Sequence, residues 1–498
     1  MELLMTGFGI VLEPSTLIYI VMGTLLGVVF GALPGVSSSM ACMLAFPFTY
    51  AMEPLPAIAF LVTVYCSAVT GGGITAILFK IPGTPASACT CLDGYPMLQR
   101  GEAGKALGLA LIGSAIGGIF SAFCMLLLAP QLSSAALKFG PSELFAVSFL
   151  GLSVMTALDQ GNALRTVISG LMGLGLACVG IDPIQGFRRL NFGSITLMNG
   201  MEMVPVMVGL FAVVEVLRQT VERTTLEKVA KDSGKVKTRV WGLGMWKMKF
   251  TIVRSAVIGT MVGILPGAGS TIASFMSYVA EVKSSKNPEA YGKGEPRGIL
   301  ASEVANNAAT GGSMVPLLSM GIPGGAAAAV MLAALTIKGV QMGPLLLQSQ
   351  PEYLATVFAA EMVANILMVI VSMAIAYAFA KILSVPYSYL GTVILLFSVV
   401  GAFSLNNNIN HVLIMAISAT VGYAFVKFRF SSSALILGLV LGELCESNLR
   451  RAILLSKGNV SLFFKSPITA ILLTAAFLML VFPLVAPLLK RKENPSEQ

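Results

Sequence analysis

The chain has little charge and few of the residue types from which enzymes and metal sites are built. Charged residues make up 11% of its 498 residues, whereas soluble globular domains carry about 25%. Its single histidine, His411, cannot form a metal site or a proton relay alone, and we expect it near a helix end. The seven cysteines are scattered through apolar segments, which argues against a disulfide framework. The chain also lacks a nucleophile–histidine arrangement and a nucleotide-binding loop, so neither an enzyme nor a self-contained ATP-driven pump is expected.

Long apolar runs take the place of charge. Residues 106–129, 355–380 and 467–489 are each long enough to cross a bilayer core, which takes about 20 helical residues. The N-terminal segment has neither a basic region nor a small-residue cleavage site, so we expect no cleavable signal peptide. The sequence predicts an all-α polytopic membrane protein with about 10–12 membrane segments.

The basic residues cluster in one place and divide the chain. Residues 218–254 hold ten Lys or Arg against three acids, although the net charge of the whole chain is only +9. Such a cluster between membrane segments is typical of a cytoplasmic loop rather than of nucleic-acid binding. We therefore predict a membrane repeat at 1–217, a basic linker at 218–254 and a second repeat at 255–460. An extra C-terminal transmembrane helix with a basic tail follows at 461–498.

The two halves share motifs. Three pairs of segments occur in the same order: GALPGVSSS (31–39) with GILPGAGST (263–271), TGGGITAILFKIPGTPAS (70–87) with TGGSMVPLLSMGIPGGAA (310–327), and, more weakly, GLSVMTALDQGNAL (151–164) with GAFSLNNNINHVL (401–413). An ordered internal repeat of this length in a membrane protein is typical of secondary transporters.

Loop charge predicts that the repeats are inverted. The loop at 51–56 has no base, whereas its counterpart at 281–297 has four. One loop further on, the first half has Arg100 and Lys105, whereas 341–352 has neither Lys nor Arg. The basic residues therefore occur in non-corresponding loops of the two repeats, as an inverted topology requires. This topology places residues 51–56 outside the cell and residues 281–297 inside it. The same topology leaves two arginine pairs, Arg188/Arg189 and Arg450/Arg451, on the outer side.

Proline and glycine in the repeated motifs predict broken or re-entrant helices. Non-helical backbone inside a membrane is tolerated where it lines a cavity or is buried in protein. A helix start there offers free N–H groups and a positive dipole end, which suit a carboxylate. Glycine and proline that serve only close packing and kinks are the alternative. The predicted substrate-binding residues are Pro34, Gly35, Ser37, Ser38, Thr70, Gly71, Gly72, Gly73, Lys80, Pro82, Gly83, Thr84, Pro266, Gly267, Gly269, Ser270, Thr271, Asn306, Asn307, Thr310, Gly311, Gly312, Ser313, Pro323 and Gly324.

Polar residues within apolar segments carry further predictions, because each is costly in a membrane. Glu303 shares a helix face with Asn306 and Asn307 and could form a cation or proton site. Alternatively, Glu303 caps the helix that follows Gly298. Lys80 pairs with a substrate carboxylate or extends to the membrane interface. The remaining acids are expected at helix ends or on scaffold helices: Asp159, Asp182, Glu202, Glu215, Glu361 and Glu443.

These motifs also carry a family resemblance. The runs LPGVSS, TGGGITAILFKIPGTPAS, LDGYPMLQRGEAGKALG, LPGAGSTIASFMSY and ASEVANNAATGG resemble the large membrane subunit of bacterial tripartite tricarboxylate transporters, the TctA family. The resemblance covers about residues 15–460. The sequence departs from it at Lys80, where asparagine is usual, and at VTGGG, which replaces YGGS.

The resemblance implies a multi-pass subunit in the bacterial inner membrane that imports a citrate-like di- or tricarboxylate by symport. It implies a periplasmic substrate-binding protein and a small membrane subunit as partners. Na⁺ or H⁺ is implied as the coupling ion, with no other cofactor. A stand-alone carboxylate carrier or channel remains the alternative.

Overall fold

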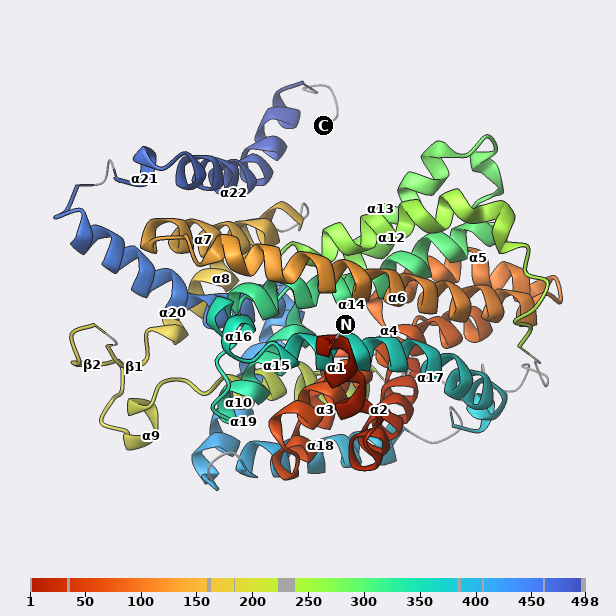
Figure 1. Ribbon diagram of the computed structural model, residues 1–498, viewed down its shortest axis with the longest axis horizontal. Coiled ribbons are helices and arrows are strands. Elements are labelled where there is room, and N and C mark those ends of the chain that lie inside the picture. The colour runs from red at the N-terminus through yellow and green to blue at the C-terminus, as the bar shows by residue number, and fades with distance from the viewer. Residues whose placement is uncertain are drawn as a thin grey trace.

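The computed structural model is almost entirely helical (Figure 1). It describes residues 2–33, 36–158, 163–182, 184–222, 238–382, 387–404, 407–459 and 462–493. Pro34, Gly35, Asp159 and residues 223–237 of the predicted linker lie outside these ranges. The strands in the described part are β1 (Gly180–Ile181) and β2 (Arg188–Arg189), which pair antiparallel. The all-α prediction is confirmed.

In the described part of the chain, the first half contains eleven α-helices. They are α1 (Glu2–Leu12), α2 (Pro14–Ala32), α3 (Ser38–Ala45), α4 (Pro54–Phe79), α5 (Ala88–Gln99), α6 (Ala103–Ala136), α7 (Pro141–Leu158), α8 (Ala163–Ala177), α9 (Ile195–Met198), α10 (Met203–Met207) and α11 (Val214–Glu222). A π-helix, η3 (Val208–Val213), joins α10 to α11.

The second half also contains eleven. They are α12 (Lys249–Ile264), α13 (Gly269–Ser284), α14 (Pro296–Met320), α15 (Ala326–Ile337), α16 (Pro344–Ser349), α17 (Glu352–Ile382), α18 (Tyr387–Ser404), α19 (Ile409–Phe428), α20 (Ser432–Leu455), α21 (Leu462–Lys465) and α22 (Pro467–Glu493).

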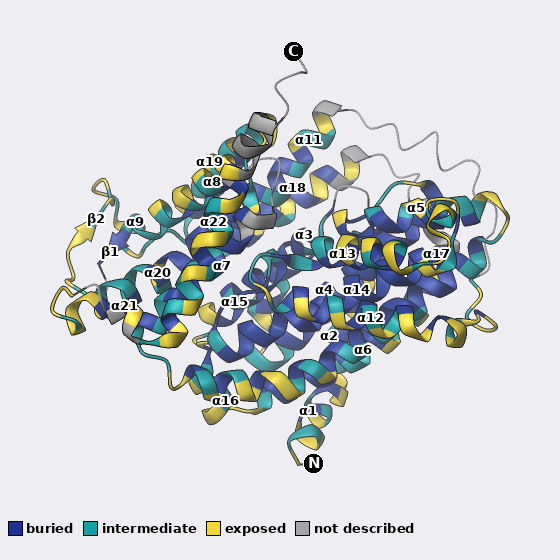
Figure 2. Cartoon of the chain, turned by 90° about the horizontal axis from the view of Figure 1, so that it is seen from above, coloured by how far each residue is buried: buried dark blue, intermediate teal, exposed yellow. Residues whose placement is uncertain are grey.

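Length, composition and exposure identify a multi-pass membrane protein. In the described part, seven helical stretches are long and apolar enough to cross a membrane, and six shorter apolar helices accompany them. Large apolar side chains form an exposed stripe on α12, where Phe250, Val253, Val257 and Met261 recur at helical spacing. Such a stripe suits lipid rather than water. By contrast, α4 and α14 lie buried at the centre of the molecule (Figure 2).

Glycine lets the central helices approach their neighbours closely. Helix α4 packs on α2, and α14 packs on α12. A Cβ at Gly71 would lie 2.5 Å from the Val28 carbonyl oxygen, and one at Gly312 would lie 2.5 Å from the Thr260 carbonyl oxygen. In these contacts Gly71 is the structural counterpart of Gly312, whereas the repeated motifs pair Gly71 with Gly311.

The predicted breaks at 70–73 and 310–313 are therefore wrong. Helices α4 and α14 run without interruption through both segments. Glycine costs about 1 kcal/mol in a helix interior relative to alanine, but here it removes side chains that would collide with the neighbouring backbone. In these two segments glycine allows close helix packing and does not interrupt the helix.

Loops that were predicted to share a side of the membrane contact each other. The Asp93 carboxylate, near the loop at 100–105, accepts backbone N–H groups of Gly292, Gly294 and Glu295 at 2.8–2.9 Å. On the opposite predicted side, Lys338 donates a hydrogen bond to the Met52 carbonyl. An inverted arrangement requires these loop neighbours, and the inversion itself stays a prediction.

Arg189 and Arg450, one from each of the two arginine pairs that the predicted topology leaves outside, join one ion-pair cluster. Arg189 lies 2.5 Å from Glu446, and Arg450 lies 2.5 Å from Asp182 and 3.1 Å from Glu446. The hydrogen bond from Arg450 lowers the pKa of Asp182 to about 2, so Asp182 is ionised at neutral pH. The cluster ties the loop after α8 to α20 and gives these arginines a structural role.

The predicted loop sides can be tested by cysteine labelling. Glu53 and Lys286 are exposed, so Glu53→Cys and Lys286→Cys leave packing unchanged. We expect a membrane-impermeant maleimide to label residue 53 in intact spheroplasts and residue 286 only after the membrane is opened. The unsubstituted chain controls for its native cysteines. Equal labelling of both positions from one side would contradict the inverted repeats.

Candidate substrate cavity

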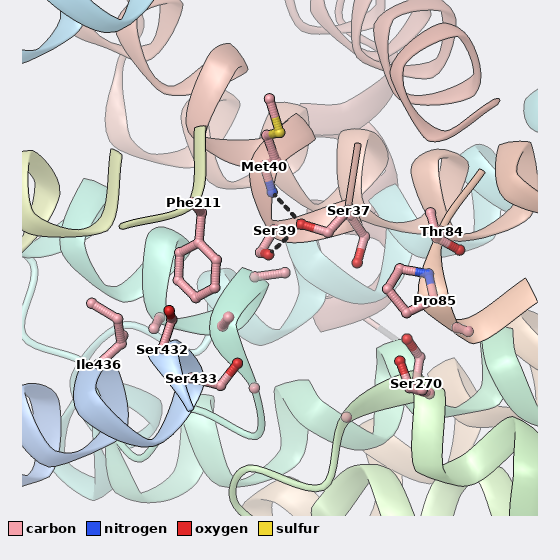
Figure 3. A pocket seen from close by; sticks show the side chains of 18 of the residues that line it. Ser37, Ser39, Met40, Thr84, Pro85, Phe211, Ser270, Ser432, Ser433 and Ile436 are labelled. Atoms are coloured by element: carbon pink, nitrogen blue, oxygen red, sulfur yellow. Dashed lines mark hydrogen bonds between the residues drawn. The ribbon is translucent and has the colours of Figure 1, made fainter. Parts of the chain in front are cut away.

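A cavity of about 710 Å³ lies between two groups of helices. Its first wall is formed by α3, the segment at 82–86 after α4, and the starts of α13 and α15. Its second wall is formed by η3, α11 and the start of α20 (Figure 3). Sites for small molecules typically measure about 300–1,000 Å³, so this cavity has room for a small organic anion.

Four helices begin at the cavity. The first residues of α3, α13, α15 and α20 are Ser38, Gly269, Ala326 and Ser432, and each lines the space. A helix start carries N–H groups without intrahelical partners and about half a positive charge. The convergence of four such starts adds partial positive charge to the cavity beyond that of any charged side chain in its wall. An anion is the ligand that this environment favours.

Hydroxyl groups from both walls face the same space. Ser37 caps α3, because its Oγ accepts the Met40 N–H at 3.2 Å, and it lies 2.9 Å from the Ser39 Oγ (Figure 3). Ser270 and Ser433 project toward the cavity from α13 and α20. These hydroxyls can donate hydrogen bonds to carboxylate oxygens, which accept but do not donate.

Two kinds of motif form the helix breaks. Helix α12 ends at Ile264, and the following Gly267 and Gly269 have φ of +79° and +64°, a backbone conformation that favours glycine. The Gly267 N–H donates to the Gly324 carbonyl at 3.0 Å, which joins the Leu-Pro-Gly and Ile-Pro-Gly breaks of the second half. In the first half, Gly83 donates to the Gly72 carbonyl of α4 at 3.3 Å.

Two charged residues lie in the cavity wall among the described residues. Arg218 donates to Glu215 through Nη2 at 2.8 Å and Nε at 3.1 Å, so the two side chains form a bidentate ion pair.

The sequence analysis placed Arg218 in the basic linker and Glu215 on a scaffold helix, and it missed their position in the cavity wall. It also missed Ser431–Ser433, although the triplet Ser-Ser-Ser occurs at both 37–39 and 431–433.

The structure brings nine of the predicted substrate residues to the cavity. They are Ser37, Ser38, Pro82, Gly83, Thr84, Gly267, Gly269, Ser270 and Thr271. Pro266, Pro323 and Gly324 lie in the breaks beside the lining residues. Pro34 and Gly35 lie outside the described residues.

The other predicted residues lie elsewhere. Eight are inside the continuous helices α4 and α14: Thr70, Gly71, Gly72, Gly73, Thr310, Gly311, Gly312 and Ser313. Lys80 ends α4, is exposed, and holds its Nζ 5.6 Å from the centre of the Tyr95 ring. It is not among the residues that line the cavity.

Glu303, Asn306 and Asn307 are fully buried on α14, away from the cavity lining. Thr90 donates to Glu303 Oε1 at 2.5 Å, and Ser114 donates to Oε2 at 3.1 Å. A Cβ at Gly73 would lie 2.8 Å from Oε1, so this glycine makes room for the carboxyl group. Helix α14 begins at Pro296 and is capped by Glu295, so the interpretation of Glu303 as a capping acid is wrong.

Comparison with known proteins connects this architecture to a family. The family described as "Tripartite tricarboxylate transporter TctA family" matches residues 17–437. The chain is 34% identical over 493 residues to the "Uncharacterized 52.8 kDa protein in TAR-I ttuC' 3'region" of Agrobacterium vitis, which covers 98% of this chain and 97% of that protein. It is 35% identical over 236 residues to the "Uncharacterized protein in TAR-II ttuC' 3'region" of the same organism, which covers 47% of this chain and 98% of that protein. No solved structure matches.

The cavity hydroxyls should contribute to the binding of a carboxylate. We expect Ser270→Ala and Thr271→Ala each to weaken the apparent affinity for citrate or its analogues by roughly two- to tenfold, since one hydrogen bond contributes about 0.5–1.5 kcal/mol. Ser284→Ala, at the exposed far end of α13, is the matched control. Unchanged affinity in both cavity variants, measured on folded protein, would exclude these hydroxyls from the site.

Proposed function

Because this chain belongs to the tripartite tricarboxylate transporter TctA family, we propose that it is the large permease subunit of a binding-protein-dependent transporter that imports a citrate-like di- or tricarboxylate. The observation that carries the proposal is the cavity at which four helices begin and to which both walls contribute hydroxyls. Such a site recognises carboxylate groups and does not require a lysine or arginine for each negative charge.

The position of the cavity supports transport by alternating access. One wall belongs to the helices that pack around α4 and α14, and the other belongs to α11 and α20. Relative movement of the two walls would expose the same site first to one side of the membrane and then to the other. Transporters commonly bind substrate at such helix breaks near the middle of the bilayer.

A polyanion needs coupled cations to enter a cell against an inside-negative potential. Moving one elementary charge across 100 mV costs about 2.3 kcal/mol, and a trianion multiplies that cost. We therefore propose secondary transport driven by a cation gradient across the bacterial inner membrane. The buried Glu303, held by Thr90 and Ser114, is a candidate to bind the cation or proton together with Asn306.

The name of the family implies three components. We propose that a periplasmic substrate-binding protein delivers the carboxylate and that a small membrane subunit accompanies this chain. A stand-alone carrier or channel is the competing possibility. The helix breaks favour a carrier, because they gather donors from both walls at one site rather than lining a continuous pore.

Reconstitution distinguishes these possibilities. We expect vesicles that hold the two membrane subunits to take up labelled citrate or another carboxylate only slowly until the binding protein is added, under imposed Na⁺ or H⁺ gradients. Binding protein whose ligand site has been inactivated is the control. Full uptake without the binding protein would contradict the tripartite mechanism, and uptake that shows no counterflow of labelled substrate would indicate a channel.

A further inference from the structure

A second buried acid lies beside α4. Glu361 is on α17, and its side chain is fully buried. None of the ion pairs in the described part of the chain includes it. Of the two places predicted for this residue, a helix end or a scaffold helix, its position within α17 excludes the helix end.

The surroundings of Glu361 contain few groups that could stabilise a negative charge. The Cys66 thiol of α4 contacts Oε1 at 3.9 Å, and Oε2 has no hydrogen-bond partner among the described residues. One turn further along α17, Asn365 donates to the Glu361 carbonyl at 2.7 Å, while its own Oδ1 also lacks a partner. Two buried oxygen acceptors without donors indicate that a proton or cation belongs here.

The titratable groups on the neighbouring helices do not supply that positive charge. Helix α4 presents Tyr65 and Cys66 toward Glu361. Helix α6 contributes Gly118, which makes room for the Asn365 side chain, and its one charged residue, Lys105, pairs with Glu102 at the other end. Helices α2 and α16 have no Asp, Glu, Lys or Arg, and α1 has only Glu2. Helix α17 itself carries Glu352 at its start and Lys381 near its end.

The chemistry of these neighbours favours a proton over a metal cation. A hard ion such as Na⁺ needs several oxygen ligands, whereas the group that contacts the Glu361 carboxyl is a thiol. Met368, another sulfur-containing residue, lies about one helical turn beyond Asn365 on the same helix. An unpaired carboxylate in a membrane interior is strongly disfavoured, whereas a neutral carboxylic acid is not.

We propose that Glu361 holds a proton in this conformation and, in addition to the Glu303 site, couples proton movement to substrate movement, an inference that rests on the proposed transport function. Helix α4 links the two sites, because Tyr65 lines the cavity and the adjacent Cys66 contacts Glu361. When the walls move and water reaches the carboxyl group, its O–H bond breaks and the proton passes to water. The carboxylate then takes up one proton from the other side to complete the cycle.

Two transport measurements on reconstituted vesicles test this assignment. Glu361→Gln mimics the protonated acid, and Glu443→Gln, at an exposed position on α20, is the matched control. We expect Glu361→Gln to retain counterflow of labelled carboxylate, which needs no gradient, and to lose accumulation driven by a pH gradient. Glu443→Gln should retain both, and Glu361→Asp should restore part of the accumulation because it keeps an ionisable acid. Accumulation by Glu361→Gln equal to that of the unsubstituted chain, or uptake driven by Na⁺ alone, would overturn the proposal.

An infrared measurement tests the protonation without transport. At neutral pH, the purified unsubstituted protein should show a protonated carboxyl band that is weaker in Glu361→Gln. An unchanged band in a variant that elutes as a folded, monodisperse protein would overturn the proposal. If the unsubstituted protein shows no counterflow of any carboxylate, the proposed transport function fails, and the infrared band then decides the protonation state of Glu361 by itself.

Discussion

The arrangement of this protein depends on one constraint, which is that backbone N–H groups inside a membrane must have hydrogen-bond partners. Most of the chain meets it by staying helical, and α4 and α14 remain continuous even through their glycine-rich segments. Where helices do begin in the interior, at Ser38, Gly269, Ala326 and Ser432, the starts gather around one cavity. In the proposed function their N–H groups donate to a carboxylate, so a feature that would be costly in lipid would serve as a binding site.

A second feature of the structure is that two acidic side chains are buried without an ion pair in the described part of the chain. Glu303 receives hydrogen bonds from Thr90 and Ser114, whereas the Cys66 thiol is the one hydrogen-bonding group at the Glu361 carboxyl in the described part of the chain. Both lie on helices that pack around α4, so the groups proposed to couple cations adjoin the element that also forms a cavity wall. In the proposed mechanism coupling would need no long pathway, because movement of α4 would change the surroundings of the cavity and of the acids together.

Sequence reasoning was effective where a residue type has one physical explanation. Both Ile-Pro-Gly motifs follow the ends of α4 and α14, and the Leu-Pro-Gly at 265–267 follows the end of α12, because proline lacks a donor and cannot continue a helix. Gly267 adopts a positive φ, and hydroxyl neighbours of these motifs do line the cavity. Sequence reasoning was wrong at Gly71–Gly73 and Gly311–Gly312, because glycine serves close helix packing equally well. The sequence could not predict the positions of Arg218, Ser431–Ser433 or Glu361. Only tertiary contacts bring Arg218, at the start of the predicted linker, and the three serines to the cavity, and only tertiary contacts bury Glu361.

The most direct measurement of the central claim is the structure of the protein determined with citrate or a related carboxylate bound. The account predicts ligand density in the cavity between the starts of α3 and α13, with carboxylate oxygens within hydrogen-bond distance of Ser38 and Ser270. Density elsewhere, for example beside Lys80 and Tyr95, with the cavity filled only by water, would contradict it.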